Sequence, residues 1–588
     1  MMQGLCRRRQ LIAIVIGSLA LASCGRLHVD GGTDDSEHSR QLTPETAIRH
    51  IVQNATRPGY VTHDQEGATL WKLTRTFYER RDYVPAWIEN RSPTPQMEGL
   101  LRAIDAADRE GLDPELYSAS LLGQRKAEAS RGFLTRKGFD ADEAVATDVC
   151  LTWLYLKYAS DLADGIADLA HADPAWKIDS KPFDPLPQLQ QALRDNRVAE
   201  SLFELAPTDP DYRALQRALG EYREQASRGG WPRVPPSLKL KPGQSSPLVP
   251  ALAARLAASR DFTGTEVAGN KPAVYDPDLQ EAAKRFQRRH GLTDDGVVGP
   301  AMVAEMNVPI EARIRQIELN MERWRWLPRD LGDPHILVNI PEMRLDVWDH
   351  GSNALSMRVV VGKKDTPTPI FNDRMTYLVF APFWNVPADI AEKETLPSAL
   401  SDPRFLTRTN MEVVDASGKP VEADDIDLSS PGKYRFRQRP GTSNALGLVK
   451  FMFPNQFNVY LHDTPADSLF SRASRSFSHG CVRVEQPEKL AEYVLRDQPD
   501  WTPERITEAM HGSEERVVKL KAAIPVYLGY WTAGVTPDRL IQFRKDVYGI
   551  DGQQTAKLAE RLERMKQGAL AAGSTLTQDV PVATSGRQ

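Results

Sequence analysis

Two short stretches of the chain, Tyr460-Leu461-His462-Asp463-Thr464 and Phe477-Ser478-His479-Gly480-Cys481-Val482-Arg483, place one thiol near two imidazoles and a glycine. A thiol is mostly protonated at neutral pH, and a histidine that accepts its proton increases the fraction of reactive thiolate. Gly480 has no side chain, so backbone N–H groups at this turn can approach a carbonyl oxygen and stabilise its developing negative charge. The pattern indicates a cysteine nucleophile. The alternative is a buried cysteine beside histidines that only pack in the core.

The sequence around this motif has a pattern typical of β-strands. Apolar, β-branched runs such as Ile336-Leu337-Val338, Met357-Arg358-Val359-Val360-Val361 and Tyr377-Leu378-Val379-Phe380 are separated by Gly, Pro and Asn. Short strands at this spacing favour a mostly β sandwich or barrel. After the cysteine, the apolar stretch from Ile524 to Ala533 is expected to return to the same sheet as a late strand.

The cysteine motif resembles the signature of the L,D-transpeptidases with a YkuD-type catalytic domain, in which a histidine precedes Ser/Thr-His-Gly-Cys at a set spacing. His462 and Ser478-His479-Gly480-Cys481 fit that spacing. The stretches Lys450 to Asn455 and Tyr460 to Pro465 resemble the large Gram-negative branch, the YcbB-like enzymes. Arg483, where many smaller members carry Asn, is also similar to that branch, and so is Asp463 in place of Gly.

The resemblance implies acyl transfer on peptidoglycan. Cys481 would attack the carbonyl of the third stem residue, diaminopimelate, release D-alanine as a thioester forms, and pass the acyl group to an amine of a neighbouring stem as a 3→3 cross-link. His462 is expected to be the general base. Gly480 is expected at the oxyanion pocket, and His479 would shape that pocket or orient the thiol, with a structural role as a close alternative. The resemblance implies no cofactor and no metal.

Four further residues are expected to contact the substrate. Arg483 carries a guanidinium, which suits bidentate recognition of a stem-peptide carboxylate, although a salt bridge inside the domain is an equal alternative. Ser478 and Tyr460 belong to the two motif stretches. Trp384 lies in Phe383-Trp384-Asn385-Val386-Pro387, which resembles a family segment, as does Thr366-Pro367-Thr368-Pro369.

The N-terminus indicates export and lipidation. Arg7-Arg8-Arg9 precedes an apolar run from Leu11 to Ala22, which is too short to span a bilayer and typical of a signal peptide. Leu21-Ala22-Ser23-Cys24 is similar to a bacterial lipobox, so residues 1–23 are expected to be removed and Cys24 acylated, with an ordinary cleaved signal as the alternative. Residues 24–42 are polar and are predicted to be a flexible tether. The expected location is the periplasm, with a lipid anchor in the outer membrane.

The cysteines and the charge of the chain indicate which disulfides and which partners to expect. Cys150 lies in an apolar stretch that predicts a buried helix, where a free cysteine behaves as a small hydrophobic residue. A disulfide to it would consume Cys481, so both thiols are predicted to be unpaired. The 74 Lys and Arg against 79 Asp and Glu leave no basic excess, so we expect no nucleic-acid partner.

A chain of 588 residues is too long for one hydrophobic core and is expected to form several domains. Residues 43–228 are predicted to be a helical domain that resembles the family's scaffold. Thr43-Pro44-Glu45 is typical of a helix start. Residues 229–247 contain many Pro and Gly and are predicted to be a linker. The residues expected on one helical face are Leu151, Leu154, Tyr155 and Tyr158.

Residues 248–308 resemble a three-helix peptidoglycan-binding module. The similarity lies in Phe286-Gln287, His290-Gly291-Leu292, Asp295-Gly296 and Gly299, whose glycines serve as positive-φ turn residues and so indicate the fold more strongly than binding. Residues 309–332 are predicted to be a connecting helix, 333–555 the catalytic domain with a lid at about 397–445, and 556–588 a charged helix and mobile tail. The expected fold class is multidomain α+β: a helical scaffold, a small helical module, and a mostly β catalytic domain with a lid insertion.

Three other functions fit parts of this pattern. An L,D-carboxypeptidase would use water as the acyl acceptor. A zinc hydrolase would use His462, His479 and Cys481 as ligands, but no helix-borne ligand pair accompanies them. An inactive lipoprotein could tether the membrane to the wall, although a pure tether has no use for an exposed thiol. The partners expected for the enzyme are peptidoglycan stem peptides and glycan, the membrane through Cys24, and cell-wall synthases.

Overall fold

The computed structural model describes residues 43–54, 57–117, 122–123, 141–166, 173–264, 273–421, 434–536 and 538–575. The chain divides into two compact units, residues 1–43 and residues 44–588. The signal peptide, Cys24 and the tether predicted from the sequence lie outside the described residues. Within the described ranges, every helix is too short or too polar to cross a membrane.

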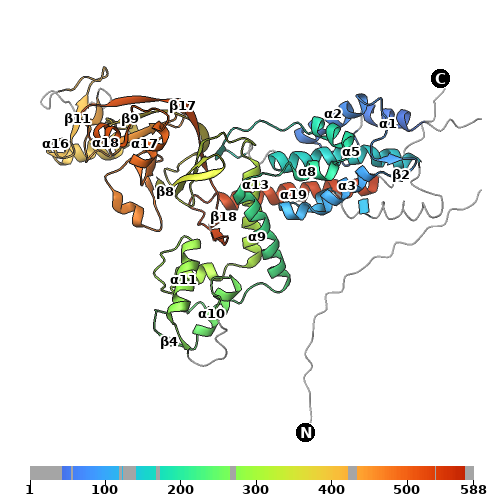
Figure 1. The fold of residues 1–588 in the computed structure, drawn as a ribbon, viewed down its shortest axis with the longest axis horizontal. Coiled ribbons are helices and arrows are strands. Elements are labelled where there is room, and N and C mark those ends of the chain that lie inside the picture. The colour runs from blue at the N-terminus through green and yellow to red at the C-terminus, as the bar shows by residue number, and fades with distance from the viewer. Residues whose placement is uncertain are drawn as a thin grey trace, which may run out of the picture. The chain divides into compact units, whose positions relative to one another are not determined.

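The second unit begins with a helical domain (Figure 1). Its central helix is α5, and the predicted face of that helix is buried together with Cys150. A buried carboxylate, Asp148, accepts hydrogen bonds from the Tyr78 hydroxyl at 2.7 Å and the Trp87 backbone N–H at 2.7 Å, which offsets the cost of its burial. The elements of this domain are α1 (Pro44–Gln53), α2 (Gln65–Glu79), β1 (Ile88–Glu89), β2 (Ser92–Pro93), α3 (Pro95–Asp105), η1 (Ala107–Glu110), η2 (Pro114–Tyr117), α5 (Ala141–Asp164), α7 (Pro185–Arg194), α8 (Val198–Phe203) and α9 (Pro210–Ser227).

The C-terminal helix α19 (Ile550–Thr575) begins before the predicted residue 556 and returns to the helical domain. Arg561 pairs with Glu66 at 2.5 Å and with Asp64, and Glu66 also pairs with the buried Lys157 at 3.1 Å. Figure 1 shows α19 beside the scaffold helices. Helix α19 is therefore part of the scaffold, and the predicted tail after Thr575 lies outside the described residues.

The small helical module has its own core. Its elements are β4 (Ser245–Ser246), α10 (Val249–Ala258), β5 (Ala273–Val274), α11 (Pro277–Arg289) and α12 (Pro300–Met306). Val234, Leu238 and Leu240 from the predicted linker are buried in this core. Pro and Gly correctly indicate turns there, but the apolar residues between the turns pack with the module, so residues 229–247 are not a free connector.

The catalytic region follows the helix α13 (Ile310–Arg325) and is built on one 10-stranded sheet. Nine strands have the order β13-β14-β16-β8-β7-β6-β17-β9-β3, where β3 is Trp176–Lys177, and the tenth, β15, pairs with β8 beside this path. The sheet closes on itself because β13 also pairs with β9. Its elements are β6 (His335–Asn339), β7 (Arg344–Asp349), β8 (Ser352–Gly362), β9 (Ile370–Phe380), β13 (Val449–Met452), β14 (Leu461–His462), η6 (Asp467–Ser471), β15 (Ser476–Ser478), β16 (Val482–Val484), α17 (Pro487–Leu495), α18 (Pro503–Met510) and β17 (Arg516–Gly529), followed by a hairpin of β18 (Ala533–Val535) and β19 (Ile541–Phe543).

One strand of this sheet comes from the scaffold. β3 (Trp176–Lys177) pairs in parallel with the start of β9, with Trp176 opposite Ile370. The Trp176 ring packs edge-on against Trp326, with centroids 5.0 Å apart. The hydrophobic core therefore runs without a break from the helical domain into the catalytic sheet.

The lid is a separate layer with a small core of Val386, Val413 and Phe436, and it begins at β10 (Trp384–Asn385), before the predicted residue 397. Its residues 422–433 lie outside the described part. Its elements are β10 (Trp384–Asn385), α14 (Ala388–Ile390), the π-helical turn η3 (Ala391–Thr395), α15 (Leu396–Ser401), α16 (Phe405–Arg408), β11 (Met411–Val414) and β12 (Arg435–Gln438), and the three strands form their own sheet.

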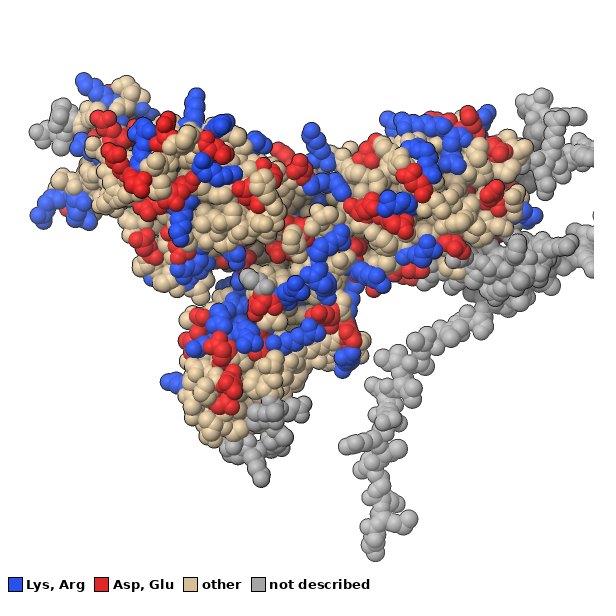
Figure 2. All heavy atoms as spheres, viewed as in Figure 1, with Lys and Arg blue, Asp and Glu red and all other residues tan. Residues whose placement is uncertain are grey.

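The fold class expected from the sequence is confirmed: helical scaffold, small helical module, and mostly β catalytic domain with an inserted lid. On the face shown in Figure 2, acidic and basic side chains are interspersed over each of these parts.

Candidate active site

Cys481 sits on a tight turn between β15 and β16. Gly480 has a φ of +119°, a conformation that favours glycine because other residues place their Cβ atom against the backbone. The Ser478 hydroxyl donates to the Cys481 carbonyl at 2.5 Å and accepts from the Gly480 N–H at 3.2 Å. Ser478 is buried, so its hydroxyl closes the turn that presents the thiol.

The Thr-Pro loop after β8 supports this turn from behind. The Thr368 hydroxyl donates to the Gly480 carbonyl at 2.8 Å, and the Thr366 hydroxyl donates to the Ser478 carbonyl at 3.2 Å. Tyr548 completes the support, because its hydroxyl donates to the Gly362 carbonyl at 2.9 Å. The loop thus accounts for the backbone polar groups that a strained turn would leave unpaired.

Cys481 is partly exposed, and polar groups surround its thiol. Its thiol lies 3.8 Å from the Asn458 carbonyl oxygen, and it is hydrogen-bonded to both the backbone and the hydroxyl of Tyr460. Burial raises the pKa of the Cys481 thiol, while the Tyr460 hydrogen bonds and the Arg483 charge oppose that rise without cancelling it. The same contact, together with burial, raises the pKa of Tyr460. The resting pair is therefore a neutral thiol and a neutral phenol.

His462 lies on β14, whose parallel partner β16 places Arg483 opposite it. The imidazole is buried, and its Nδ1 is 2.5 Å from the Asp463 carbonyl oxygen. Burial, and then the positive charge of Arg483, lowers the pKa of His462 to about 3, so the ring is neutral at neutral pH. Among the described residues, no hydrogen bond joins His462 to Cys481. Tyr460 is a neighbour of both residues. Its ring centroid lies 5.7 Å from that of His462, and it also affects the pKa of the Cys481 thiol.

Arg483 carries a charge without a matching carboxylate. No salt bridge of Arg483 occurs within the described part of the chain, and its buried Nε has no hydrogen-bond partner there. Burial lowers the pKa of Arg483, and the nearby Cys481 opposes that shift. A buried donor without a partner costs free energy, which an incoming acceptor would recover. This arrangement does not contain the internal salt bridge considered from the sequence.

His479 points to the lid rather than to the thiol. Its Nε2 lies 2.8 Å from the Glu394 Oε1 of the π-helical turn η3, and both side chains are partly exposed. The sequence did not identify Glu394, because the lid has no periodic pattern from which its position could be inferred.

Trp384 is half-buried and packs against the small core of the lid. Its strand β10 pairs with β12, which places Trp384 opposite Gln438. Phe383, the preceding residue, lies under the Arg437 guanidinium at 4.2 Å. Trp384 therefore belongs to the base of the lid, and the described contacts do not connect it to Cys481.

Metal-ligand geometry occurs elsewhere in the molecule. In the described part, the group of side chains close enough to share an ion is Asp333, Asp349 and His350, and two of these three are exposed. His462, His479 and Cys481 do not converge in this way within the described ranges.

Comparisons with known families match three separate parts of the chain. Residues 333–515 match the "L,D-transpeptidase catalytic domain", residues 72–219 match the "Scaffold domain", and residues 245–306 match the "Putative peptidoglycan binding domain". A curated Haemophilus influenzae protein described as "Putative L,D-transpeptidase" is 34% identical over 249 residues, or 41% of this chain. This chain spans 50% of the length of that relative.

Two solved structures carry related names. An L,D-transpeptidase from Mycobacterium smegmatis is 15% identical, covers 33% of this chain and 58% of its own, and has a TM-score of 0.17. An L,D-transpeptidase from Stackebrandtia nassauensis is 15% identical, covers 50% of this chain and 96% of its own, and has a TM-score of 0.21. The chain therefore contains one segment that matches the L,D-transpeptidase catalytic domain, together with segments that match a scaffold domain and a putative peptidoglycan-binding domain.

Proposed function

We propose that this protein is a peptidoglycan L,D-transpeptidase that uses Cys481 as its nucleophile. The observation that carries the proposal is the partly exposed Cys481 on the Gly480 turn, with the Arg483 guanidinium close enough to affect its pKa. A thiol that can reach solvent beside an unpaired cation is suited to a substrate that brings both a carbonyl and a carboxylate.

The proposed acylation begins with proton transfer from Cys481. The neutral imidazole of His462 is the acceptor, and the Tyr460 hydroxyl provides a hydrogen bond that stabilises the thiolate. Sulfur then forms a bond to the carbonyl carbon of the third stem residue, and the C–N bond to the terminal D-alanine breaks. The proton held by His462 passes to the departing amine. Backbone N–H groups of the Gly480 turn would stabilise the oxyanion, and Arg483 would hold a substrate carboxylate.

The second half of the reaction releases the enzyme. An amine from a neighbouring stem attacks the thioester, its proton passes to His462, and the C–S bond breaks as the proton returns to sulfur. The product is a 3→3 cross-link. His479 and Glu394 would set the position of the lid over this reaction, because they join the lid to the residue before Gly480.

The proposal also includes a location. Acylation at Cys24 would anchor the protein in the outer membrane, and the tether would allow the scaffold and catalytic domains to reach the wall from the periplasm. The peptidoglycan-binding type domain would contact the same polymer. Replacing Cys24 with Ala should block lipidation and signal processing, whereas the chain that starts after the tether should be soluble and still catalytically competent.

The test of function is product analysis. The purified chain without residues 1–42 is incubated with a disaccharide-tetrapeptide, and the products are identified by mass spectrometry. Transpeptidation predicts a cross-linked dimer with loss of one D-alanine. The tripeptide alone would indicate an L,D-carboxypeptidase, and unchanged substrate would favour an inactive wall-binding protein. Inhibition by a chelator, reversed by zinc, would favour the zinc hydrolase.

A further inference from the structure

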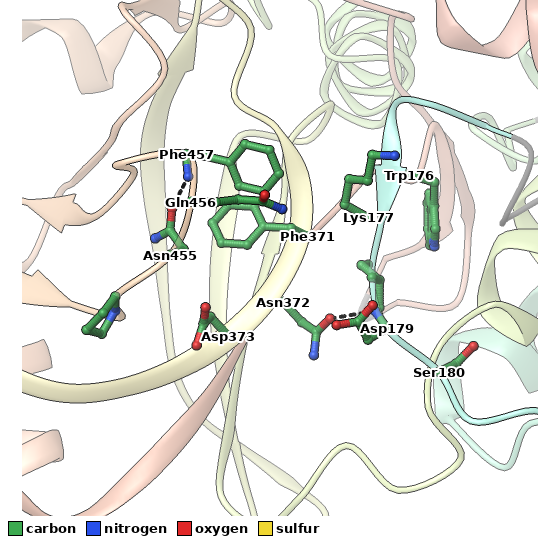
Figure 3. Close-up of a pocket in the computed structure, with 12 residues that line it drawn as sticks. Trp176, Lys177, Asp179, Ser180, Phe371, Asn372, Asp373, Asn455, Gln456 and Phe457 are labelled. Atoms are coloured by element: carbon green, nitrogen blue, oxygen red, sulfur yellow. Dashed lines mark hydrogen bonds between the residues drawn. The ribbon is translucent and has the colours of Figure 1, made fainter.

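A cavity lies where the scaffold meets the catalytic sheet. Its volume is about 670 Å³, and three segments line it: residues 176–180, residues 371–373 of β9, and residues 454–457. Figure 3 shows these segments side by side, with the scaffold segment carrying Lys177 and Asp179 on one side and the loop carrying Gln456 and Phe457 on the other. This volume is in the range typical of sites for small ligands.

The walls of the cavity are held in place by specific bonds. The Asp179 backbone N–H donates to the Asn372 Oδ1 at 2.8 Å, next to the pairing of β3 with β9. On the opposite wall, the Asn455 side-chain amide donates to the carbonyls of Phe453 at 2.6 Å and Val459 at 2.7 Å. A site whose backbone is already ordered loses little conformational entropy when a ligand binds.

Several polar groups at this cavity have no partner. The side chains of Lys177, Asp179 and Gln456 are exposed and make no hydrogen bond or ion pair with other described residues. The half-buried Phe457 ring lies 4.9 Å from the Phe371 ring and provides an aromatic surface beside these groups.

The charged side chains that line the cavity indicate which class of ligand it can bind. Two carboxylates, Asp179 and Asp373, and one ammonium, Lys177, line the cavity, so it is unfavourable for a stem peptide with several carboxylates. A saccharide is neutral, and each hydroxyl can both donate and accept, so it can pair with carboxylate, amide and ammonium groups. Its C–H faces can pack on the Phe457 ring. We propose that this cavity binds an N-acetylated saccharide unit of the glycan strand, an inference that rests on the proposed function.

The loop between β13 and β14 connects this cavity to the nucleophile. Residues 454–457 line the cavity, while Asn458 contacts the Cys481 thiol through its carbonyl at 3.8 Å and Tyr460 hydrogen-bonds to the same sulfur. One short segment therefore borders both sites. The scaffold domain, through residues 176–180, would select substrates that still carry their glycan.

The kinetic test compares two donors, a disaccharide-tetrapeptide and the free tetrapeptide. The test variant is Asp179→Asn with Gln456→Ala, and the matched control is Asp497→Asn with Gln553→Ala, which alters exposed residues outside the cavity. In the wild type, kcat/KM should be about tenfold higher for the disaccharide donor. The ratio should fall close to one in the test variant and persist in the control, while carbapenem acylation of Cys481 is the same in all three. An unchanged ratio in the test variant, or no preference in the wild type, would overturn the proposal.

A binding test separates this inference from the catalytic one. The chain with Cys481→Ala, otherwise intact, is irradiated with di-N-acetylchitobiose that carries a photoreactive diazirine, and the labelled peptides are mapped by mass spectrometry. Labels in residues 176–180, 371–373 or 454–457 that disappear in the Asp179→Asn, Gln456→Ala background are expected. This result would stand even if the protein catalysed no transfer. Labels confined to residues 245–306 would show that the saccharide binds elsewhere and would refute the cavity assignment.

Discussion

The turn after Phe286 in the peptidoglycan-binding type domain and the turn at Gly480 both combine a histidine, a glycine and polar side chains, but their contacts differ. In the first, Gln287 accepts from the Gly296 N–H at 2.8 Å and donates to the Val297 carbonyl at 3.0 Å. His290 is buried and stacks on Phe286 with ring centroids 3.8 Å apart. In the second turn, Ser478 makes two hydrogen bonds, but Cys481 is partly exposed and the Arg483 Nε has no partner among the described residues.

This difference shows how two equally specific sequence motifs can carry different information. The polar groups of the first motif satisfy one another, so its residues explain how the domain folds. In the second motif, Ser478, Gly480 and the Thr-Pro loop make the hydrogen bonds that hold the turn. Cys481 and Arg483 take no part in these bonds and can contact a substrate. Reactivity is therefore expected at the second turn, and the following predictions test that contrast.

The largest effect is expected at Cys481. Its replacement by Ala should lower both D-alanine release and cross-linking by about 10⁴-fold or more, because the reaction loses its nucleophile. The thermal midpoint should change little, since Cys481 is partly exposed and contributes little to the core. Cys150→Ala is the control: this buried thiol should affect stability but not turnover. If Cys481→Ala and Cys150→Ala had comparable turnover, the Gly480 turn would not carry the nucleophile.

His462 is expected to have the next largest effect. His462→Ala should slow acylation by about 10²–10⁴-fold, the usual contribution of a general base. Because the pKa of His462 is lowered to about 3, the base remains unprotonated as the pH falls. Acylation should therefore show no acid limb centred near the ordinary histidine pKa of about 6.5. A titration midpoint near that value, or a greater loss from His479→Ala, would assign the base to His479 instead.

Arg483 is expected to act on binding and on the thiol. Arg483→Gln should raise KM by about 10- to 100-fold for donors with a free carboxylate, since a charged hydrogen bond is lost, and should affect amidated donors less. The guanidinium lowers the pKa of Cys481, so its removal should move the alkylation midpoint to higher pH, and Arg483→Lys should restore part of that shift. Equal losses for free and amidated donors would mean that Arg483 serves only the fold.

The smallest catalytic effect is expected in the peptidoglycan-binding type domain. Gln287→Ala should destabilise that domain by about 1–3 kcal/mol because it leaves the Gly296 N–H without its acceptor. Hydrogen exchange should quicken for amides of residues 277–306, while carbapenem acylation of Cys481 keeps its rate. A parallel loss of acylation would show that the two turns are coupled.

The sequence was sufficient for features that depend on local pattern. Three features follow from the order of residues and are present in the structure. They are the strands that carry His462 and Ser478 next to Cys481, the short strands from Ile336 onward, and the burial of the predicted residues of α5. The prediction that no disulfide joins Cys150 and Cys481 is also confirmed.

Other features depend on contacts between segments distant in the sequence. The two-residue strand Trp176–Lys177 has no strand periodicity of its own and is fixed by its pairing with β9. The Glu394 contact with His479 joins an irregular lid to the nucleophile turn. The placement of Trp384 in the lid core and the burial of Val234, Leu238 and Leu240 likewise reflect tertiary packing, which a linear pattern does not encode.

The most direct test of the central claim is to trap the acyl-enzyme and locate it. The chain without residues 1–42 is mixed with the tetrapeptide donor, quenched in acid within one turnover, digested, and analysed by mass spectrometry. We predict a mass increase equal to the donor minus D-alanine on the peptide that contains Cys481, and its release by hydroxylamine, as expected of a thioester. An acyl group on any other residue, or cross-linking that proceeds at full rate in Cys481→Ala, would contradict the account.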